Sequence, residues 1–223
     1  MRVLVMGATG GSGRAAVDAL VAEGHEVTAF ARRASAAFAG KDGVRPVDGD
    51  ATVAADVERV VEGQDAVIVV LGISENALRV RLRGSAGTPL DVRSRGIAAT
   101  VAAMQRHGVR RLVVQSSYGV GETRDLLPFS SRLVFALVLR PQIADTEAQE
   151  RIVRSSGLDW TIVQPVTLTD GDEPAARSRT GGTDGMKVSR RAVGGVLADL
   201  ATHATDVGAS VSVSGAADVL AAA

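Results

Sequence analysis

Three glycines at a spacing of three residues, Gly7, Gly10 and Gly13, stand close to the start of this chain and restrict its fold more than any other feature. Residues 3–6 before them are continuously apolar, which is typical of a strand buried on both faces. Residues 15–22 after them carry apolar side chains at helical spacing. A strand, a glycine-rich turn and a helix in this order predict the phosphate-binding turn of a nucleotide-binding α/β fold.

Glycine suits such a turn for two physical reasons. It has no side chain that would keep the backbone away from a pyrophosphate group, and it adopts the backbone angles of a tight turn without strain. The helix expected to begin near Ser12 would direct its free amide N–H groups and the positive end of its dipole at the phosphates. The turn therefore predicts a bound dinucleotide.

The rest of the chain continues the alternation of strand and helix. Further strands are expected at residues 26–31, 44–47, 66–71, 112–114, 160–163 and 210–213. Further helices are expected at residues 52–62, 91–107, 142–156 and 189–201. This alternation predicts a doubly wound, three-layer α/β fold of the Rossmann type, with a parallel sheet covered on both faces. Residues 1–223 are expected to form one such domain, with small substrate-side segments towards the C-terminus.

The kind of dinucleotide is indicated by the end of the second expected strand. Sites that bind NAD place an Asp or Glu there, about 20 residues after the glycines, to bond the ribose hydroxyls. Here the strand ends Ala31-Arg32-Arg33, and Glu26 stands at its opposite end. A guanidinium holds a phosphate by paired hydrogen bonds, so Arg32 and Arg33 predict NADP(H), and Arg14 is placed to reach the same 2′-phosphate. The alternative is three solvent-facing arginines in an arginine-rich chain.

Two long segments without a helix or strand pattern follow expected strands. Residues 72–89 are rich in Gly, Ser and Arg, and residues 167–186 are rich in Gly, Asp, Ser and Thr. Both should lie at the carboxyl edge of the sheet, where open α/β folds bind their ligands. A third segment, residues 126–139, is unusually apolar, and we expect it to pack on the sheet, to wall a substrate pocket or to form a subunit contact.

Further short motifs follow the expected strands. They are Gly49-Asp50-Ala51, Val70-Leu71-Gly72, Gln115-Ser116-Ser117-Tyr118, the SGLDWTIVQP segment at residues 156–165, and Val188-Ser189-Arg190. With the glycine turn, these motifs make the chain resemble the atypical short-chain dehydrogenase/reductases, a group that includes NmrA-like proteins and the biliverdin reductase B/flavin reductase type. The resemblance covers nearly the whole chain and bears on fold and cofactor more than on substrate.

This resemblance implies a role for each matching residue in binding NADP(H). The phosphates would be cradled by Gly7, Thr9, Gly10, Ser12, Gly13 and Arg14. The 2′-phosphate would be held by Arg32 and Arg33, the adenine contacted by Asp50 and Ala51, and the ribose flanked by Leu71 and Gly72. The nicotinamide would lie near Ser116, Pro165, Val166 and Leu168.

Catalytic candidates follow the fifth expected strand. Most members of the broader superfamily use a Tyr-x-x-x-Lys pair, in which the lysine lowers the tyrosine pKa so that the phenol exchanges a proton with the substrate. Here Tyr118 is the only tyrosine, and Glu122 stands four residues after it. Ser116 and Tyr118, with Ser117 between them, are therefore the candidates to hydrogen-bond or protonate the acceptor. The alternative is that the serines only end the strand and the phenol packs.

Without a Tyr-x-x-x-Lys pair, the expected activity is a reductase in which NADPH passes hydride to a conjugated acceptor of the quinone, flavin or tetrapyrrole type. Such acceptors can take their proton from water. The alternative is a non-catalytic regulatory protein that senses NADP(H), as some NmrA-like proteins do. An epimerase or dehydratase that retains its cofactor is a third alternative.

Charge and composition bear on partners and location. The formal net charge is zero, so no net field favours nucleic acid or an anionic membrane. No apolar stretch is long enough to span a bilayer, and the three histidines stand too far apart for a zinc site. We expect a cytoplasmic, monomeric or homodimeric protein that acts on a small molecule. The carboxylates of Asp145, Glu147 and Glu150 are expected on a solvated helix face beside arginines.

Overall fold

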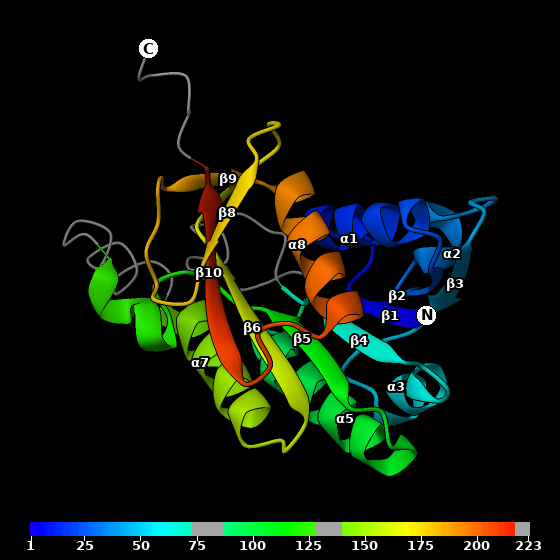
Figure 1. The fold of residues 1–223 in the computed structure, drawn as a ribbon. Helices are drawn as coiled ribbons and strands as arrows, with labels where there is room; N and C mark the ends of the chain where they lie inside the picture. The colour runs from blue at the N-terminus through cyan, green and yellow to red at the C-terminus, as the bar shows by residue number, and fades with distance from the viewer. Residues whose placement is uncertain (73–86, 128–139, 217–223) are drawn as a thin grey trace.

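In the computed structural model, which describes residues 1–72, 87–127 and 140–216, a sheet lies between two layers of helices (Figure 1). The strands are β1 (Arg2–Met6), β2 (Glu26–Ala31), β3 (Val44–Asp48), β4 (Ala66–Val69), β5 (Arg111–Gln115), β6 (Asp159–Pro165), β7 (Thr167–Thr169), β8 (Ala175–Ser178), β9 (Lys187–Ser189) and β10 (Ala209–Gly215). The helices are α1 (Gly11–Ala22), α2 (Ala34–Ala37), α3 (Ala54–Val61), α5 (Val92–His107), α7 (Arg140–Arg154) and α8 (Arg190–His203), with a 3₁₀ helix η1 (Gly121–Leu126).

The main sheet has the order β3-β2-β1-β4-β5-β6-β10-β8, in which β8 is antiparallel to β10 and the other neighbours are parallel. The chain moves outwards from β1 to β3 and then returns to place β4 on the other side of β1. In register, Val5 stands between Ala29 of β2 and Ile68 of β4. The Rossmann-type expectation is confirmed, and the reversal between β1 and β4 is where such sheets open a ligand crevice.

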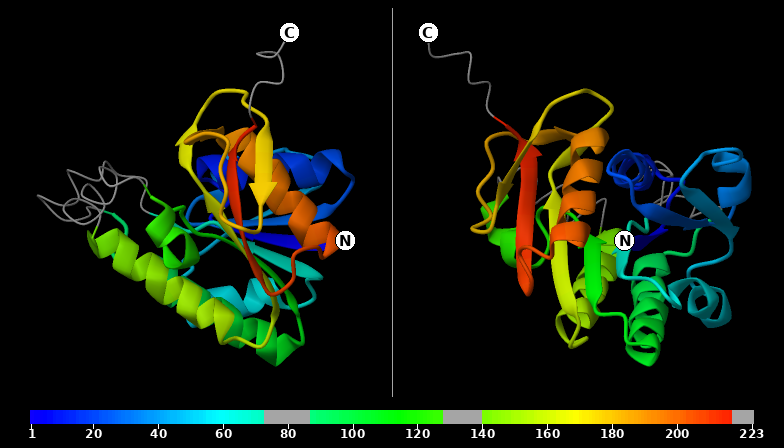
Figure 2. Two further views of the ribbon diagram at one scale, coloured as in Figure 1. Left: turned by 60° about the vertical axis from the view of Figure 1, so that its left-hand side comes forward. Right: turned by 45° about the vertical axis from the view of Figure 1, so that its right-hand side comes forward.

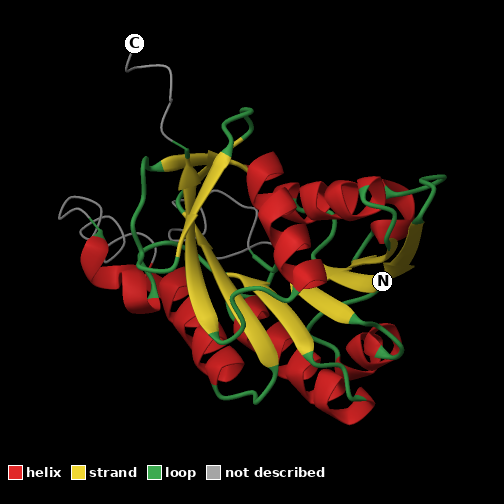
Figure 3. Cartoon of the chain, in the orientation of Figure 1, coloured by secondary structure: helices red, strands yellow, loops and turns green. Residues whose placement is uncertain are grey.

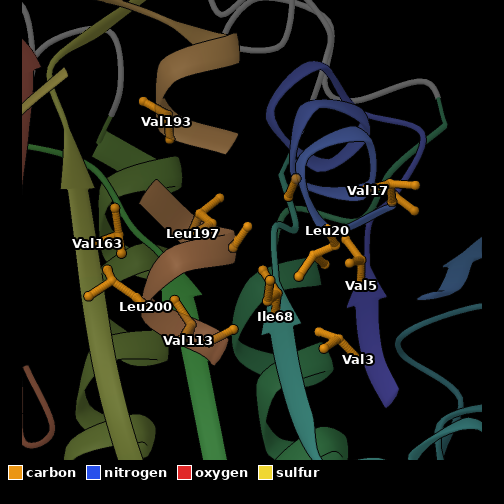
Figure 4. Close-up of a cluster of buried hydrophobic side chains, with 14 of the residues drawn as sticks. Val3, Val5, Val17, Leu20, Ile68, Val113, Val163, Val193, Leu197 and Leu200 are labelled. Atoms are coloured by element: carbon orange, nitrogen blue, oxygen red, sulfur yellow. The ribbon is translucent and has the colours of Figure 1, made fainter. Parts of the chain in front are cut away.

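Alternate residues of the central strands pack against the helices on the two opposite faces of the sheet. On one face, Val5, Ile68 and Val113 pack against α1 and α8, as Figure 4 shows for the labelled side chains. On the other face, Leu4 and Leu112 belong to a second buried cluster with residues of α3, α5 and α7. Figure 2 shows the two layers from two other directions, and Figure 3 separates helices from strands by colour in the orientation of Figure 1. Burial on both faces explains why these strands are apolar without interruption.

Helix ends follow the expected signals. The Ser189 hydroxyl accepts a hydrogen bond from the amide of Ala192 and so caps α8. Gly108 ends α5 in the left-handed conformation, with a φ of 69°. α1 begins at Gly11, earlier than the apolar pattern suggests. The pattern does not extend to this first turn, because glycine has no side chain that could contribute to a helical spacing of apolar residues. None of the described helices is long and apolar enough to cross a membrane.

The expectation that residues 167–186 are irregular is wrong. β7 pairs with β9, and β8 pairs with β10, so two strands lie within this segment. Both strands are short, and their partners are distant in sequence, so no local pattern marks them. The two other segments singled out in the sequence are residues 72–89 and 126–139. Of these, residues 73–86 and 128–139 lie outside the described residues.

Candidate functional site

A crevice of about 200 Å³ opens at the carboxyl edge of the main sheet, where β1 lies beside β4. Its walls come from the exits of β1 to β4 and from the residues that lead into α5. The lining residues are Gly7, Thr9, Gly10, Phe30, Ala31, Arg32, Gly49, Asp50, Ala51, Val70, Leu71, Gly72, Thr88, Pro89 and Val92. The structure thus gathers the predicted phosphate, adenine and ribose positions in one place.

The glycine turn at the base of this crevice is as tight as its sequence predicts. Gly7 has a φ of +80°, and a Cβ there would stand 2.2 Å from the carbonyl oxygen of Val70. A Cβ on Gly13 would stand 2.3 Å from the carbonyl oxygen of Gly7. Side chains at these positions would collide with backbone, so glycine is required for β1, the turn and β4 to approach this closely.

The first turn of α1 is suited to an anion. Among the described residues, no side chain caps this turn, and the turn holds no acidic residue. Its first amide N–H groups and the positive end of the helix dipole are therefore available to a phosphate. Ser12 and Gly13 are buried in this turn and are not among the crevice-lining residues. These features fit a dinucleotide pyrophosphate.

Asp50 shapes the end of the crevice where the adenine is predicted. Its carboxylate accepts hydrogen bonds of 2.8 Å from both the amide and the hydroxyl of Thr52. The hydrogen bond from the Thr52 amide, with that from its hydroxyl and the charges of Arg32 and Arg95, lowers the pKa of Asp50 despite partial burial. The Asp50 amide in turn donates to Asp56 at 2.9 Å. These hydrogen bonds therefore link the residues of the loop after β3 on both sides of buried Ala51.

The three arginines predicted for the 2′-phosphate occupy different positions. Arg32 lines the crevice, and its guanidinium donates to the carbonyl of Gly87 and, at 3.2 Å, to the hydroxyl of Thr88. Arg33 is exposed at the N-cap of α2. The guanidinium carbon of Arg14 lies 5.2 Å from the centre of the Phe38 ring. Arg32 is thus the one of the three that borders the described crevice.

Leu71 and Gly72 form the wall after β4. A Cβ on Gly96 of α5 would stand 2.3 Å from Leu71 Cδ1, so the absence of a side chain there admits the leucine. A Cβ on Gly72 would stand 3.0 Å from Nη2 of Arg93. Burial lowers the pKa of the Arg93 guanidinium, and the charge of Asp145 opposes that shift. A desolvated cation therefore lies directly behind this wall.

The residues predicted near the nicotinamide lie at the exits of β5 and β6, on the same edge of the sheet. Pro165 ends β6, and the amide of buried Val166 donates to the carbonyl of Val213 at 3.0 Å. Leu168 lies in β7, where it pairs with Val188. None of the three is among the lining residues of the described crevice. Their contact with a nicotinamide therefore stays a prediction.

The catalytic candidates already have hydrogen-bond partners within the protein. Ser116 is buried, and its hydroxyl donates to Glu150 Oε1 at 2.5 Å. Tyr118 is buried, and its hydroxyl donates to the carbonyl of Gly181 at 3.1 Å. Ser117, between them, is only partly buried and donates to the carbonyl of Tyr118 at 3.3 Å. The catalytic roles of Ser116 and Tyr118 stay predictions, and a proton transfer by either must first break these bonds.

Glu150 itself was expected on a solvated helix face, and this expectation is wrong. Its side chain is buried and accepts hydrogen bonds from Gln164 Nε2 at 2.9 Å and from Arg154 Nη2 at 3.4 Å, in addition to Ser116. Ser116 directly follows β5, Gln164 lies in β6, and Arg154 lies in α7. Among the described residues, no group of three His, Cys, Asp or Glu side chains is arranged to hold a metal ion.

Asp145 is also buried rather than solvated. Its two carboxylate oxygens accept hydrogen bonds of 3.0 Å from the amides of Arg93 and Ser94, so a side chain of α7 caps the first turn of α5. The buried face of α7 includes Asp145, Thr146, Gln149, Glu150 and Val153. This buried face of α7 is largely polar, so the hydropathy of its residues predicts that it faces solvent. The one sequence feature that fits burial is the helical spacing of these residues.

Comparison with known sequences finds similarity over most of the chain. The model of the NAD(P)H-binding family matches residues 7–204. An uncharacterised chloroplastic protein of Arabidopsis thaliana is 30% identical over 171 residues, which are 74% of this chain and 58% of that protein. The chain therefore spans less than two thirds of that relative's length.

Solved structures with the same fold cover almost the entire chain. A short-chain dehydrogenase/reductase of Veillonella parvula, solved with NADP, has a TM-score of 0.77 at 18% identity and covers 96% of this chain and 94% of its own. ChuY of Escherichia coli O157:H7, described as an anaerobilin reductase, has a TM-score of 0.73 at 21% identity and covers 96% and 97%. At these identities the likeness establishes the fold alone.

Proposed function

This chain belongs to the NAD(P)H-binding family, and we propose that it is an NADPH-dependent reductase that passes hydride to a small conjugated acceptor. Quinones, flavins and tetrapyrroles are the acceptor classes that fit. Members of the family bind a nicotinamide dinucleotide, and the crevice described above is the place where this fold would hold it.

The observation that carries the proposal is Arg32 at the rim of the crevice. It follows β2, where an NAD site would carry an acid, and it is already oriented by bonds to Gly87 and Thr88. A guanidinium in this position supplies paired donors and a permanent positive charge to a 2′-phosphate. This arrangement favours NADPH over NADH.

The chain's own residues have separable tasks in the proposed reaction. The turn from Gly7 to Gly13 and the first turn of α1 bind the pyrophosphate, Arg32 binds the 2′-phosphate, and Asp50 orients the adenine. NADPH, when bound, supplies the hydride. The exits of β5 and β6 would then flank the reacting ring, with the partly buried Ser117 as the more accessible of the two serines.

The proposed acceptor class rests on the absence of a Tyr-x-x-x-Lys pair, the usual proton donor of the superfamily, from this sequence. Tyr118 is its only tyrosine, Glu122 stands in place of the lysine, and the Tyr118 hydroxyl is bonded to Gly181. A simple carbonyl needs a positioned acid to protonate the developing alkoxide. A conjugated acceptor spreads the charge over its π-system and takes its proton from water, so it needs no such acid.

The test follows NADPH absorbance during incubation with panels of quinones, flavins and linear tetrapyrroles, with NADH in parallel. Consumption of NADPH by at least one acceptor, and slower consumption of NADH, is the expected result. Binding of NADPH by calorimetry without turnover of any acceptor would contradict the reductase.

The buried bonds of Ser116 and Tyr118 favour one alternative, a regulatory protein that senses NADP(H). Both predicted catalytic hydroxyls are committed to internal partners, as expected where they serve structure alone. A sensor would bind NADP⁺ and NADPH with different affinities, which calorimetry measures directly, and would consume neither. Equal affinities together with turnover would exclude this alternative.

A further inference from the structure

The side chain of Arg190 lies against the phosphate-binding turn, although the two are almost 180 residues apart in sequence. Arg190 is the first residue of α8 and directly follows the capping residue Ser189. A Cβ on Gly11 would stand 2.3 Å from Arg190 Cδ and 3.0 Å from its Nε. Gly11 therefore leaves open the space that the arginine side chain occupies.

Close packing of α8 on α1 sets this position. The two helices lie side by side in Figure 1, and a Cβ on Gly194 would stand 2.4 Å from the Cβ of Ala15. Ala15 lies four residues after Gly11, and Gly194 lies four residues after Arg190, so the two contacts are about one helical turn apart on both helices. The contact between Arg190 and Gly11 is thus part of the same helix interface.

The present partner of Arg190 is weakly held. Its Nη1 lies 2.6 Å from Asp170 Oδ1, but the Asp170 side chain is 89% exposed and that of Arg190 is 35% exposed. Ion pairs open to solvent contribute little, because water and salt compete for both charges. The guanidinium can therefore exchange this carboxylate for a stronger anion nearby.

We propose that Arg190 binds the pyrophosphate of the dinucleotide from the α8 side of the turn, giving up Asp170 when it does so. The proposal rests on the proposed dinucleotide-binding function. The amides at the start of α1 supply only neutral donors, whereas the pyrophosphate carries negative charge. A guanidinium adds positive charge and paired N–H donors, and Gly11 is the position at which its stem reaches the turn.

This assignment predicts a pattern that separates Arg190 from Arg32. NADH and NADPH share the pyrophosphate, and only NADPH has the 2′-phosphate. In calorimetric titrations, Arg190→Gln should weaken the binding of NADPH and of NADH by similar factors. The dissociation constants should rise by about tenfold or more, as expected for loss of a charged hydrogen bond. A loss confined to NADPH, or no loss for either dinucleotide, would overturn the proposal.

Two further variants test whether Arg190 acts directly. Arg191→Gln removes the neighbouring arginine, which is 85% exposed and lies 3.6 Å from Asp172, so binding should be unchanged. Asp170→Asn removes the competitor and should leave affinity equal or higher. If Asp170→Asn weakens binding as much as Arg190→Gln does, the pair acts only by holding the segment after β7, and the proposal is wrong.

Failure of this inference can be told apart from failure of the proposed function. If wild-type protein binds neither dinucleotide, the proposed function is wrong. If wild-type protein binds them and Arg190→Gln binds equally well, only the role of Arg190 is wrong. The thermal midpoint of each variant without dinucleotide shows whether the folded state is intact. Only a small decrease is expected for Arg190→Gln, because it loses an exposed ion pair and part of the stem beside Gly11.

Discussion

The hydroxyl of Ser116 donates a hydrogen bond to the carboxylate of Glu150 at 2.5 Å, and both side chains are buried. The bond joins the exit of β5 to α7. Gln164 Nε2 bonds the same carboxylate oxygen and also the carbonyl of Val120, so Glu150 holds the segment after β5 against β6. A residue expected to be solvated is therefore a structural centre beside the predicted nicotinamide position.

Glu150→Ala should lower the free energy of unfolding by about 3 kcal/mol, because Ser116 and Gln164 lose a buried charged acceptor. Denaturant titration measures the change. Glu147→Ala on the same helix is the matched control, since its partner Arg124 is largely exposed, and it should cost less than about 1 kcal/mol. Equal costs for the two variants would show that the buried bonds add nothing.

Gly7→Ala should be far more destabilising than Gly24→Ala. Both glycines have a φ of 80°, so both variants incur the strain of a left-handed alanine, about 1–2 kcal/mol. Only at Gly7 would the new Cβ meet backbone, 2.2 Å from the Val70 carbonyl, whereas nothing lies within 4 Å at Gly24. The difference between the thermal midpoints of the two variants measures the effect of the collision with the Val70 carbonyl. Similar midpoints would show that this collision does not destabilise the protein.

Arg32→Ala should reduce affinity for NADPH by about tenfold or more and leave affinity for NADH nearly unchanged, because only NADPH offers a 2′-phosphate. Arg33→Ala should have a smaller effect, since Arg33 does not line the described crevice. Titration of both dinucleotides against each variant measures the ratio. Equal loss for NADPH and NADH in Arg32→Ala would remove its role at the 2′-phosphate.

Asp50 should make stability depend on acid pH. Hydrogen bonds from Thr52 lower the pKa of Asp50 below its ordinary value of 3.8, so the ionised form stabilises the folded state above that pH. This contribution is lost as pH falls through the lower, folded-state pKa. Asp50→Asn should therefore show a shallower fall in unfolding free energy between about pH 5 and about pH 3 than wild type.

The control for this series is Asp172→Asn, whose side chain is 90% exposed. It should follow the wild-type dependence on pH, because it removes a carboxylate without removing bonds from Thr52. An Asp50→Asn profile parallel to those of wild type and Asp172→Asn would show that Asp50 ionisation does not contribute to stability.

The order of the elements, and much of the crevice, could be predicted from local patterns. Each of these patterns lies within a short stretch of sequence, as the apolar runs of β1 and β4 and the helical spacing in α5 illustrate. The positions of Gly7, Arg32 and Asp50 after successive strands then follow, because the carboxyl ends of parallel strands share one edge. β7 and β8 were missed because short strands depend on partners elsewhere in the chain for their stability.

The buried polar contacts could not be predicted in this way. Asp145 caps a different helix, and Glu150 contacts Ser116 after β5 and Gln164 in β6, so neither contact has a local signature. Hydropathy assigns a carboxylate to solvent unless its partners are known. The same limit applies to Arg190, which looks like any residue at the start of a helix until α8 is placed on α1.

The sequence by itself determined the Rossmann-type alternation and the phosphate turn, because apolar period and glycine spacing act through the backbone over a few residues. Only the tertiary structure decided which polar side chains face inwards and which arginine lies at the turn. Those outcomes depend on contacts between residues far apart in the chain, such as Ser116 with Glu150 and Gly11 with Arg190, whose geometry exists only once the layers have packed.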